Sequence, residues 1–172
     1  MKLSLIYAQL DNGSLGYAGP EPMAWNIPED LQHFKALTMG KALLMGSNTF
    51  DSLPRLLPGR FHFVLTKRKG LHRLGRLDQV QFVPSIDEAI RLAEEVGFDE
   101  LVGIGGADVA SQMVGRVEVV HRTVIRGVVL TEKKMQISAP DLEAYDFDMV
   151  EQYAAETQGV WFQTWVKKAE EE

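Results

Sequence analysis

Short runs of apolar residues divide the chain into segments with the length of buried β-strands. Runs of about four to eight apolar residues, bounded by turn residues, are typical of strands that are covered on both faces. The first run is followed by the turn residues Asp11, Asn12 and Gly13. Strands are predicted on this basis at residues 3–8, 42–45, 61–65, 80–83 and 101–104 and, with a break near Gly127, within residues 117–129.

Between these runs, apolar residues recur at helical spacing. Leu31 and Phe34 fall on one side of a helix predicted over residues 28–39, which Pro28 can begin and Gly40 can end.

A second helix is predicted over residues 86–96. Ser85 and Glu88 form a capping box in front of it, and Gly97 closes it. Shorter helical segments are predicted at residues 49–53, which Pro54 ends, and at residues 108–114.

The alternation of strands with helices predicts the fold class. We expect an α/β protein in a single domain, 1–172, with a mostly parallel, twisted central sheet flanked by about four helices. Residues 149–156 and 160–166 predict a C-terminal antiparallel hairpin at the edge of that sheet. Residues 15–24 are rich in Gly and predict a flexible loop, and residues 167–172 predict a frayed tail.

Composition narrows the class of protein. In a chain of 172 residues, an apolar content of 45% allows a sizeable core. No apolar run reaches the roughly 18 residues of a membrane span, and no signal-peptide cleavage site follows the first strand, so we expect no membrane partner. The absence of cysteine excludes disulfides, thiolate metal sites and cysteine nucleophiles, and it fits a cytoplasmic protein. A net charge of -6 argues against a nucleic-acid partner.

Positive charge is nevertheless concentrated between residues 55 and 76, where no acid occurs. The run fits either a solvated basic face or a site for anionic ligands, and we favour the second interpretation. Its cations are Arg55, Arg60, Lys67, Arg68, Lys69, Arg73 and Arg76.

One acid stands at the edge of an apolar helix face. Asp30 lies two residues past Pro28 and directly precedes Leu31. An acid beside an apolar surface should lose solvation, and its pKa should rise. Acids in the first turn of a helix also complement the helix dipole. This segment alone leaves both interpretations open.

Two strand-to-helix turns suit phosphate binding. Gly105 and Gly106 allow a close approach of backbone to a phosphate, and a helix N-terminus follows them. In the turn over residues 46–49, Thr49 can offer a hydroxyl and an amide to a phosphate, or it can simply cap the helix. Neither turn is a full dinucleotide fingerprint, so a tight turn without a ligand also stays open.

Four blocks of the sequence together resemble the dihydrofolate reductase family. They are Trp-Asn-Ile-Pro-Glu-Asp-Leu-Gln-His-Phe-Lys at residues 25–35, Met-Gly-Ser-Asn-Thr-Phe-Asp-Ser-Leu at 45–53, Leu-Pro-Gly-Arg at 57–60 and Val-Gly-Ile-Gly-Gly-Ala at 102–107. The blocks come in the order of the family at nearly its spacing, between Leu3 and about Thr123. A chance match to all of them in order is not plausible.

The resemblance implies an NADPH-dependent enzyme that passes a hydride to C6 of dihydrofolate and delivers a proton to N5. It implies dihydrofolate and antifolates as small-molecule partners, a monomer, and no metal. The implied catalytic residues are Asp30, Trp25 and Thr123. The implied substrate-binding residues are Ile6, Tyr7, Ala8, Leu31, Phe34, Lys35, Leu53, Leu57, Arg60 and Ile104. The implied cofactor-binding residues are Ala8, Leu15, Gly16, Gly46, Ser47, Asn48, Thr49, Leu65, Thr66, Lys67, Arg68, Ile104, Gly105, Gly106, Ala107, Asp108 and Val109.

Individual roles at the substrate end follow from the same resemblance. In the family, the acid that Asp30 matches is the only ionisable side chain in the pterin pocket. Thr123 matches a threonine that hydrogen-bonds this acid, and Trp25 would hold a water beside it. Arg60 would hold the α-carboxylate of the glutamate tail, since a guanidinium pairs with a carboxylate through two hydrogen bonds. Without the resemblance, Thr123 would be an ordinary strand residue, the apolar residues plain core, and Lys35 a solvated helix lysine.

At the cofactor end, the family carries a cis peptide at the pair matched by Gly105 and Gly106, next to the pyrophosphate. The turn Thr66-Lys67-Arg68 would meet the 2′-phosphate of the adenosine. A solvated surface position is the alternative for Lys67.

The sequence departs from the family pattern at several places. Ser47 stands where a basic residue is common, and Ala110 stands where many members have an aromatic residue beside the nicotinamide. The active-site loop, residues 16–24, is a residue or two longer than usual. Residues 131–140 lack the usual Gly-Asp, so the partner of the active-site loop is in doubt.

Two other functions remain in competition with dihydrofolate reduction. One is a related reductase that acts on a ribosylated pyrimidine in riboflavin synthesis, against which Arg60 and residues 25–35 argue. The other is a non-catalytic folate-binding, nucleotide-binding or structural protein, against which Asp30, Trp25 and Thr123 argue.

Overall fold

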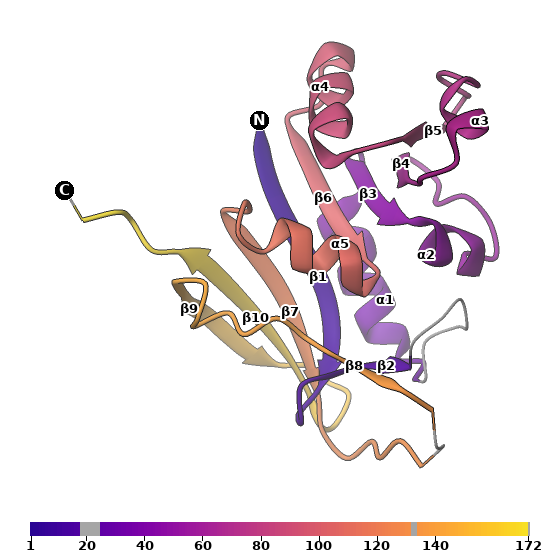
Figure 1. The fold of residues 1–172 in the computed structure, drawn as a ribbon. Helices are drawn as coiled ribbons and strands as arrows, with labels where there is room; N and C mark the ends of the chain where they lie inside the picture. The colour runs from indigo at the N-terminus through magenta and orange to yellow at the C-terminus, as the bar shows by residue number, and fades with distance from the viewer. Residues whose placement is uncertain (18–24, 132–133, 172) are drawn as a thin grey trace.

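An eight-stranded sheet forms the centre of the protein (Figure 1). The structure is a computed structural model that describes residues 1–17, 25–131 and 134–171. The strand order is β5-β4-β3-β6-β1-β7-β10-β9. In that order the strands are Val80–Val83, Phe61–Leu65, Ala42–Gly46, Glu100–Gly105, Lys2–Leu10, Val119–Ile125, Val160–Lys167 and Phe147–Ala154.

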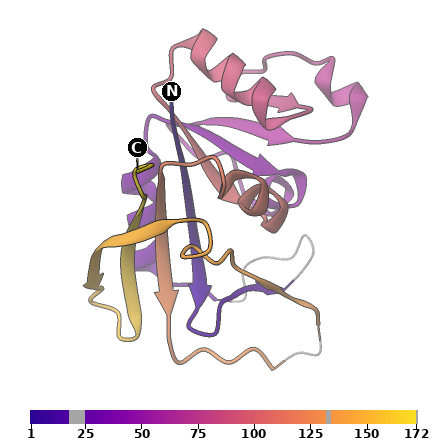
Figure 2. The same cartoon turned by 60° about the vertical axis from the view of Figure 1, so that its left-hand side comes forward.

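The strands from β5 to β7 run parallel, and β10 and β9 add an antiparallel edge (Figures 1 and 2). The mostly parallel sheet and the C-terminal hairpin that the sequence predicts are therefore confirmed. In parallel strands the carboxyl ends meet at one edge of the sheet, which is where α/β proteins bind ligands.

Helices cover both faces of the sheet. Helix α1 (Pro28–Thr38) passes behind the sheet in the view of Figure 1, whereas α4 (Ile86–Val96) and α5 (Ala107–Met113) lie in front of it. The two shorter helices, α2 (Ser47–Ser52) and α3 (Lys69–His72), follow the carboxyl ends of β3 and β4.

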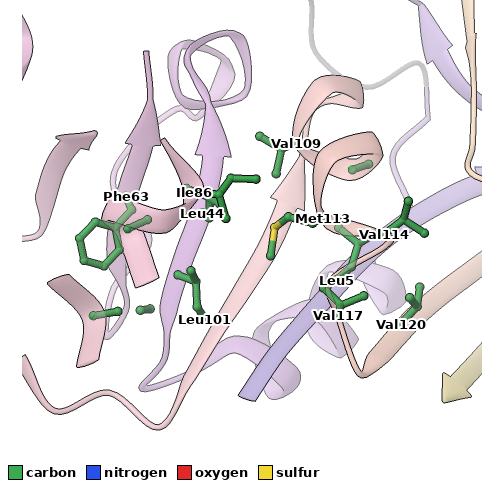
Figure 3. Close-up of a cluster of buried hydrophobic side chains, with 14 of the residues drawn as sticks. Leu5, Leu44, Phe63, Ile86, Leu101, Val109, Met113, Val114, Val117 and Val120 are labelled. Carbon is green, nitrogen blue, oxygen red and sulfur yellow. The ribbon is translucent and has the colours of Figure 1, made fainter. Parts of the chain in front are cut away.

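Each central strand sends alternate side chains into two apolar clusters. Leu5 and Leu44 pack with Met113 of α5 in the cluster that Figure 3 shows. Their sequence neighbours Ile6 and Leu43 pack on the opposite face, in the cluster that Phe34 and Leu37 of α1 join. Both faces of these strands are covered, which explains why the strands read as continuous apolar runs rather than as alternating patterns.

Local signals predicted the long helices well. Helix α4 has the predicted bounds because Ser85 Oγ accepts the amide of Glu88 at 3.1 Å and Gly97 takes a positive φ of 101°. Helix α2 begins at Ser47, two residues earlier than predicted, and its N-cap is Gly46 without a side-chain cap. Thr49 is therefore not a capping residue.

Three elements were not predicted. Residues 15–17 belong to strand β2 (Ser14–Tyr17), which pairs with β8 (Gln136–Ser138) in a second, two-stranded sheet. The prediction of a flexible loop from residue 15 is wrong for this part, and residues 18–24 lie outside the described residues. Helix α3 was missed because its four residues carry no apolar periodicity. The pairing of β2 with β8 answers the doubt about what contacts the start of the active-site loop.

Candidate active site

A cavity of about 1690 Å³ opens at the carboxyl ends of the parallel strands. All three implied catalytic residues line it, as do all implied substrate-binding and cofactor-binding residues. The predicted residues come from segments as far apart as β1, α1, β4, β6 and β7, and the fold brings them to one place.

Asp30 is the third residue of α1 and is partly buried in the cavity wall. Thr123 Oγ1, from β7, donates a hydrogen bond of 2.7 Å to Asp30 Oδ1. Burial raises the pKa of Asp30, while the bond from Thr123 and the nearby His33 act in the opposite direction. The direction of the shift and the contact with Thr123 are both as predicted.

Trp25 also lines the cavity. Its Nε1 is buried and has no hydrogen-bond partner among the described residues. A Cβ on Gly16 would lie 3.8 Å from the indole ring, so β2 passes close to this ring. A buried indole N–H that lines a cavity is available to a ligand or to a water bound with one.

An apolar slot extends from Asp30 along the face of α1. Phe34, Leu53, Leu57 and Ile104 are partly buried and pack together there. Leu31 lines the cavity with 58% of its surface exposed. A large apolar side chain at this exposure on a concave surface is typical of a binding site.

Tyr7 differs from its neighbours in β1. Ile6 and Ala8 point to the face that α1 covers, whereas the ring of Tyr7 packs against the cluster on the opposite face. Burial raises the pKa of Tyr7 to about 12, against the opposing charge of Arg122. Tyr7 lines the cavity, but its side chain packs on the face of the sheet opposite to α1.

Arg60 closes the far end of the slot. Its residue surface is 6% exposed. Its Nε donates to the carbonyl of Pro58 at 3.0 Å and its Nη1 to Thr38 Oγ1 at 3.2 Å. Burial lowers the pKa of the guanidinium, but arginine stays charged. Two bonds to neutral oxygens fix the side chain and leave its charge uncompensated among the described residues.

The other half of the cavity has a backbone cradle. The Gly105-Gly106 peptide is cis, as the resemblance implied, and Gly105 has a φ of 116°. A Cβ on Gly106 would lie 3.5 Å from Thr49 Oγ1, and a Cβ on Gly46 would lie 3.8 Å from the nitrogen of Gly106. The two strand-to-helix turns therefore lie side by side within van der Waals distance. Their glycines carry no side chain between the backbone and the cavity, which suits the approach of a phosphate.

A polar turn follows β4 at the outer end of this half. Thr66 is 8% exposed, and its Oγ1 accepts the amide of Arg68 at 3.2 Å. His72 of α3 donates from Nε2 to the carbonyl of Thr66 at 2.7 Å, which fixes the turn. Lys67 and Arg68 are exposed, and their side chains form no ion pair with the described residues.

Some cations of the basic run over residues 55–76 fit a site for anionic ligands, and the others fit a solvated basic face. Arg55, Arg60, Lys67 and Arg68 line the cavity, whereas Lys69, Arg73 and Arg76 do not. The first four fit a site for anions, and the last three belong to the basic surface around α3.

Several residues of the cavity wall were missed by the sequence reasoning. They include Tyr17, Ile137, Ser85, Asp87, Gln112 and Arg116. Ile137 reaches the cavity through the pairing of β8 with β2, which has no local signal. Ser85 was recognised only as a helix cap, although a helix N-terminus beside a cavity is also a site for anions. Two departures from the family pattern, Ser47 and Ala110, both line the cavity.

The described residues contain neither a membrane-spanning helix nor a metal-binding group of side chains. No helix there is long and apolar enough to cross a membrane. Nor do its His, Asp and Glu side chains form a group of three or more that could hold a metal ion.

Comparison with known proteins identifies the family. Residues 2–166 match the family model described as dihydrofolate reductase. A dihydrofolate reductase type 9 from Escherichia coli is 35% identical over 125 residues, which cover 70% of this chain and 68% of the relative. A dihydrofolate reductase from Mycobacterium tuberculosis (strain ATCC 25618 / H37Rv) is 39% identical over 95 residues, which cover 54% of this chain and 55% of the relative.

The fold also matches a solved structure. A dihydrofolate reductase from Enterococcus faecalis, complexed with NADP(H) and RAB-propyl, superposes with a TM-score of 0.80 at 23% identity, over 98% of this chain and 97% of that one. At this identity the structural match shows the fold alone. The family model matches nearly the whole sequence, and this chain therefore belongs to the dihydrofolate reductase family.

Proposed function

We propose that the protein is an NADPH-dependent dihydrofolate reductase that converts 7,8-dihydrofolate to tetrahydrofolate. The observation that carries the proposal is the carboxyl group of Asp30, held by Thr123 at 2.7 Å, at one end of an apolar slot that Arg60 closes at the other. Such a slot suits a flat heterocycle with basic nitrogens at one end and a carboxylate at the other, which is the chemical outline of a folate.

At the pterin end, Asp30 accepts hydrogen bonds from the amino group and the ring N–H of the substrate. Bonds to a charged acceptor are short and strong, and Thr123 fixes the carboxylate so that it faces the slot. Leu31 and Phe34 cover the ring and exclude water from it. At the other end, Arg60 binds the α-carboxylate, with Lys35 at the rim.

The cofactor half of the cavity fits a phosphorylated dinucleotide. The cradle formed by Gly46, Gly105 and Gly106 leaves space for a pyrophosphate against backbone, with the hydroxyl of Thr49 beside it. Thr66, Lys67 and Arg68 at the outer end bind the 2′-phosphate, since a hydroxyl and two cations suit a phosphate dianion. NADPH, when bound, supplies the hydride.

Proton delivery is the task of the substrate end. Asp30 favours protonation of N5 through a water that the indole N–H of Trp25 holds. The buried position of Asp30 raises its pKa, which increases its protonated fraction at a given pH. The apolar slot holds the pterin in place, so that proximity supplies much of the rate.

The decisive experiment follows the loss of NADPH absorbance with dihydrofolate as substrate, with and without an antifolate. Turnover that the antifolate abolishes supports the proposal. Turnover with a ribosylated aminopyrimidine instead would assign the protein to the related reductases of riboflavin synthesis. Folate binding without NADPH oxidation would indicate a non-catalytic binding protein. We also propose a monomer without a membrane partner. The net charge of -6 argues against a nucleic-acid partner, and the absence of cysteine fits a cytoplasmic protein.

A further inference from the structure

A buried histidine lies directly behind the carboxylate end of the slot. His62 is the second residue of β4 and is 0% exposed. Its side chain points to the face of the sheet that α1 covers, because Phe61 and Phe63 on either side of it belong to the cluster on the other face. His62 is a polar residue in an otherwise apolar strand, and it does not line the cavity. A contact with substrate therefore does not explain why a histidine stands here.

Both ring nitrogens of His62 are hydrogen-bonded to backbone. Nε2 accepts the amide hydrogen of Leu57 at 3.0 Å, and Nδ1 lies 3.1 Å from the carbonyl oxygen of Gln79. A carbonyl can only accept and an amide can only donate, so the ring carries its proton on Nδ1 and presents a bare Nε2. Burial lowers the pKa of His62, with the charge of Arg60 acting in the same direction and the bond to Gln79 against it. The neutral ring is thus the form that the site accommodates.

These bonds reach the residues that we assign to the substrate tail. Leu57 and Arg60 both line the cavity, within one short loop between α2 and β4. Gln79 Nε2 donates to the carbonyl of Arg60 at 3.3 Å, so the residue that bonds to the ring of His62 also holds the end of the loop at Arg60. Inside the loop, Arg60 Nε holds the carbonyl of Pro58. The position of the guanidinium therefore depends on the path of this loop.

We propose that His62 is a positioning residue for the carboxylate end of the site: its bare Nε2 fixes the amide of Leu57, and thereby the loop that aims Arg60 at the substrate tail. The proposal rests on the function proposed above. It predicts that His62 contributes to the affinity for the glutamate tail and little to the affinity for the pteridine ring, which Asp30 binds at the other end of the slot.

The test compares folate with pteroate, which lacks the glutamate. Equilibrium binding of each is measured by quenching of tryptophan fluorescence, since Trp25 lines the cavity. The wild-type chain should bind folate about 10- to 100-fold more tightly than pteroate, the usual worth of a charged hydrogen-bonded pair. Failure of the wild type to bind either compound would refute the proposed function. This outcome is distinguishable from failure of the His62 proposal, which is tested by the ratio of the two affinities in the variants.

Two variants isolate the bond to Leu57. His62→Leu removes the acceptor and leaves a buried amide unpaired, so the ratio of folate to pteroate affinity should fall about tenfold while the affinity for pteroate changes less than about threefold. His62→Gln can keep an acceptor near the position of Nε2, and its ratio should stay within about threefold of wild type. The control His72→Leu deletes another bond from histidine to backbone, beyond the opposite end of β4, and should leave the ratio unchanged.

An unchanged ratio in a cooperatively melting His62→Leu protein would overturn the proposal. So would an equal loss for both ligands, or the same loss of ratio in His72→Leu, because either would indicate general loosening. If His62→Leu does not fold, the wild-type chain and His62→Gln decide. ¹⁵N NMR of the wild-type ring must then show protonated Nδ1 and bare Nε2, and a folded His62→Gln must keep the ratio. The other tautomer, or a lost ratio in that variant, refutes the assignment.

Discussion

Replacing Asp30 with asparagine removes the carboxyl group at the pterin end of the cavity while keeping its size and shape. The amide oxygen of Asn can still accept the bond that Thr123 donates at 2.7 Å, so the N-terminal turn of α1 should keep its place. What disappears is the negative charge and the ability to supply a proton. The variant therefore separates the chemistry of the site from its architecture.

The size of the effect follows from what else could replace the lost acid. Among the described residues that line the cavity, the remaining carboxyl groups are those of Asp87 and Asp108. They lie on α4 and α5, in the half that we assign to the cofactor. With no substitute near N5, the full contribution of a general acid should be lost, which is about 10²- to 10⁴-fold in turnover. The loss should shrink as the pH falls, because the substrate can then be protonated from solvent.

The assay is the rate of hydride transfer in a single turnover, measured from pH 5 to 9 for the wild type and for Asp30→Asn. Asp51→Asn is the matched control, since Asp51 is an exposed acid on α2 that does not line the cavity. Rates of Asp30→Asn within about threefold of wild type at neutral pH would refute the role of Asp30. A loss of equal size at every pH would mean that Asp30 binds the substrate but takes no part in protonation.

The remaining predictions test the other contacts. Thr123→Val deletes the bond that lowers the pKa of Asp30, so the decline of the hydride-transfer rate with rising pH should move to higher pH; a profile that stays in place would rule out control by Thr123. Arg60→Leu should raise KM for dihydrofolate about 10- to 100-fold and change kcat little, because the tail contact is the same in the ground state and the transition state. Lys67→Ala with Arg68→Ala should erase most of the preference for NADPH over NADH while barely changing the use of NADH, and equal losses with both cofactors would show that the pair acts elsewhere. Thermal melts should show Glu29→Gln less stable and Asp30→Asn more stable than wild type at neutral pH, with both differences shrinking in acid.

The sequence predicted the parts of the fold that local signals determine. The bounds of β4, β5 and α4 agree with the prediction because apolar runs and caps are encoded by neighbouring residues. Strands β2 and β8 were missed because each is short and their pairing joins residues about 120 positions apart, such as Gly16 and Ile137. Such pairs are stabilised by the rest of the fold and leave no periodic pattern.

The candidate site was predicted from a resemblance rather than from physical patterns. Nothing local connects Asp30 with Thr123, which are 93 residues apart, and only the family pattern paired them. His62 shows what was overlooked, since a histidine inside an apolar strand run must find hydrogen-bond partners when the strand is buried. The position of this histidine in the sequence is therefore a signal that points to the neighbouring loop, which carries Leu57 and Arg60.

Glu29 and Asp30 are neighbouring acids whose pKa values are shifted in opposite directions. The carboxylate of Glu29 lies at the surface and accepts the amide and the hydroxyl of Thr157, both at 2.7 Å, and these bonds lower its pKa. A lowered pKa in the folded state means that the group stabilises the fold above its unfolded pKa, and this stability is lost as the pH falls through the folded value. Asp30 is the reverse case: burial raises its pKa, so the ionised form costs stability at neutral pH, and the cost disappears once acid protonates it in both states. The helix is thus tied to the β9–β10 turn by one acid and carries, at the next position, an acid whose burial is useful for catalysis and unfavourable for folding.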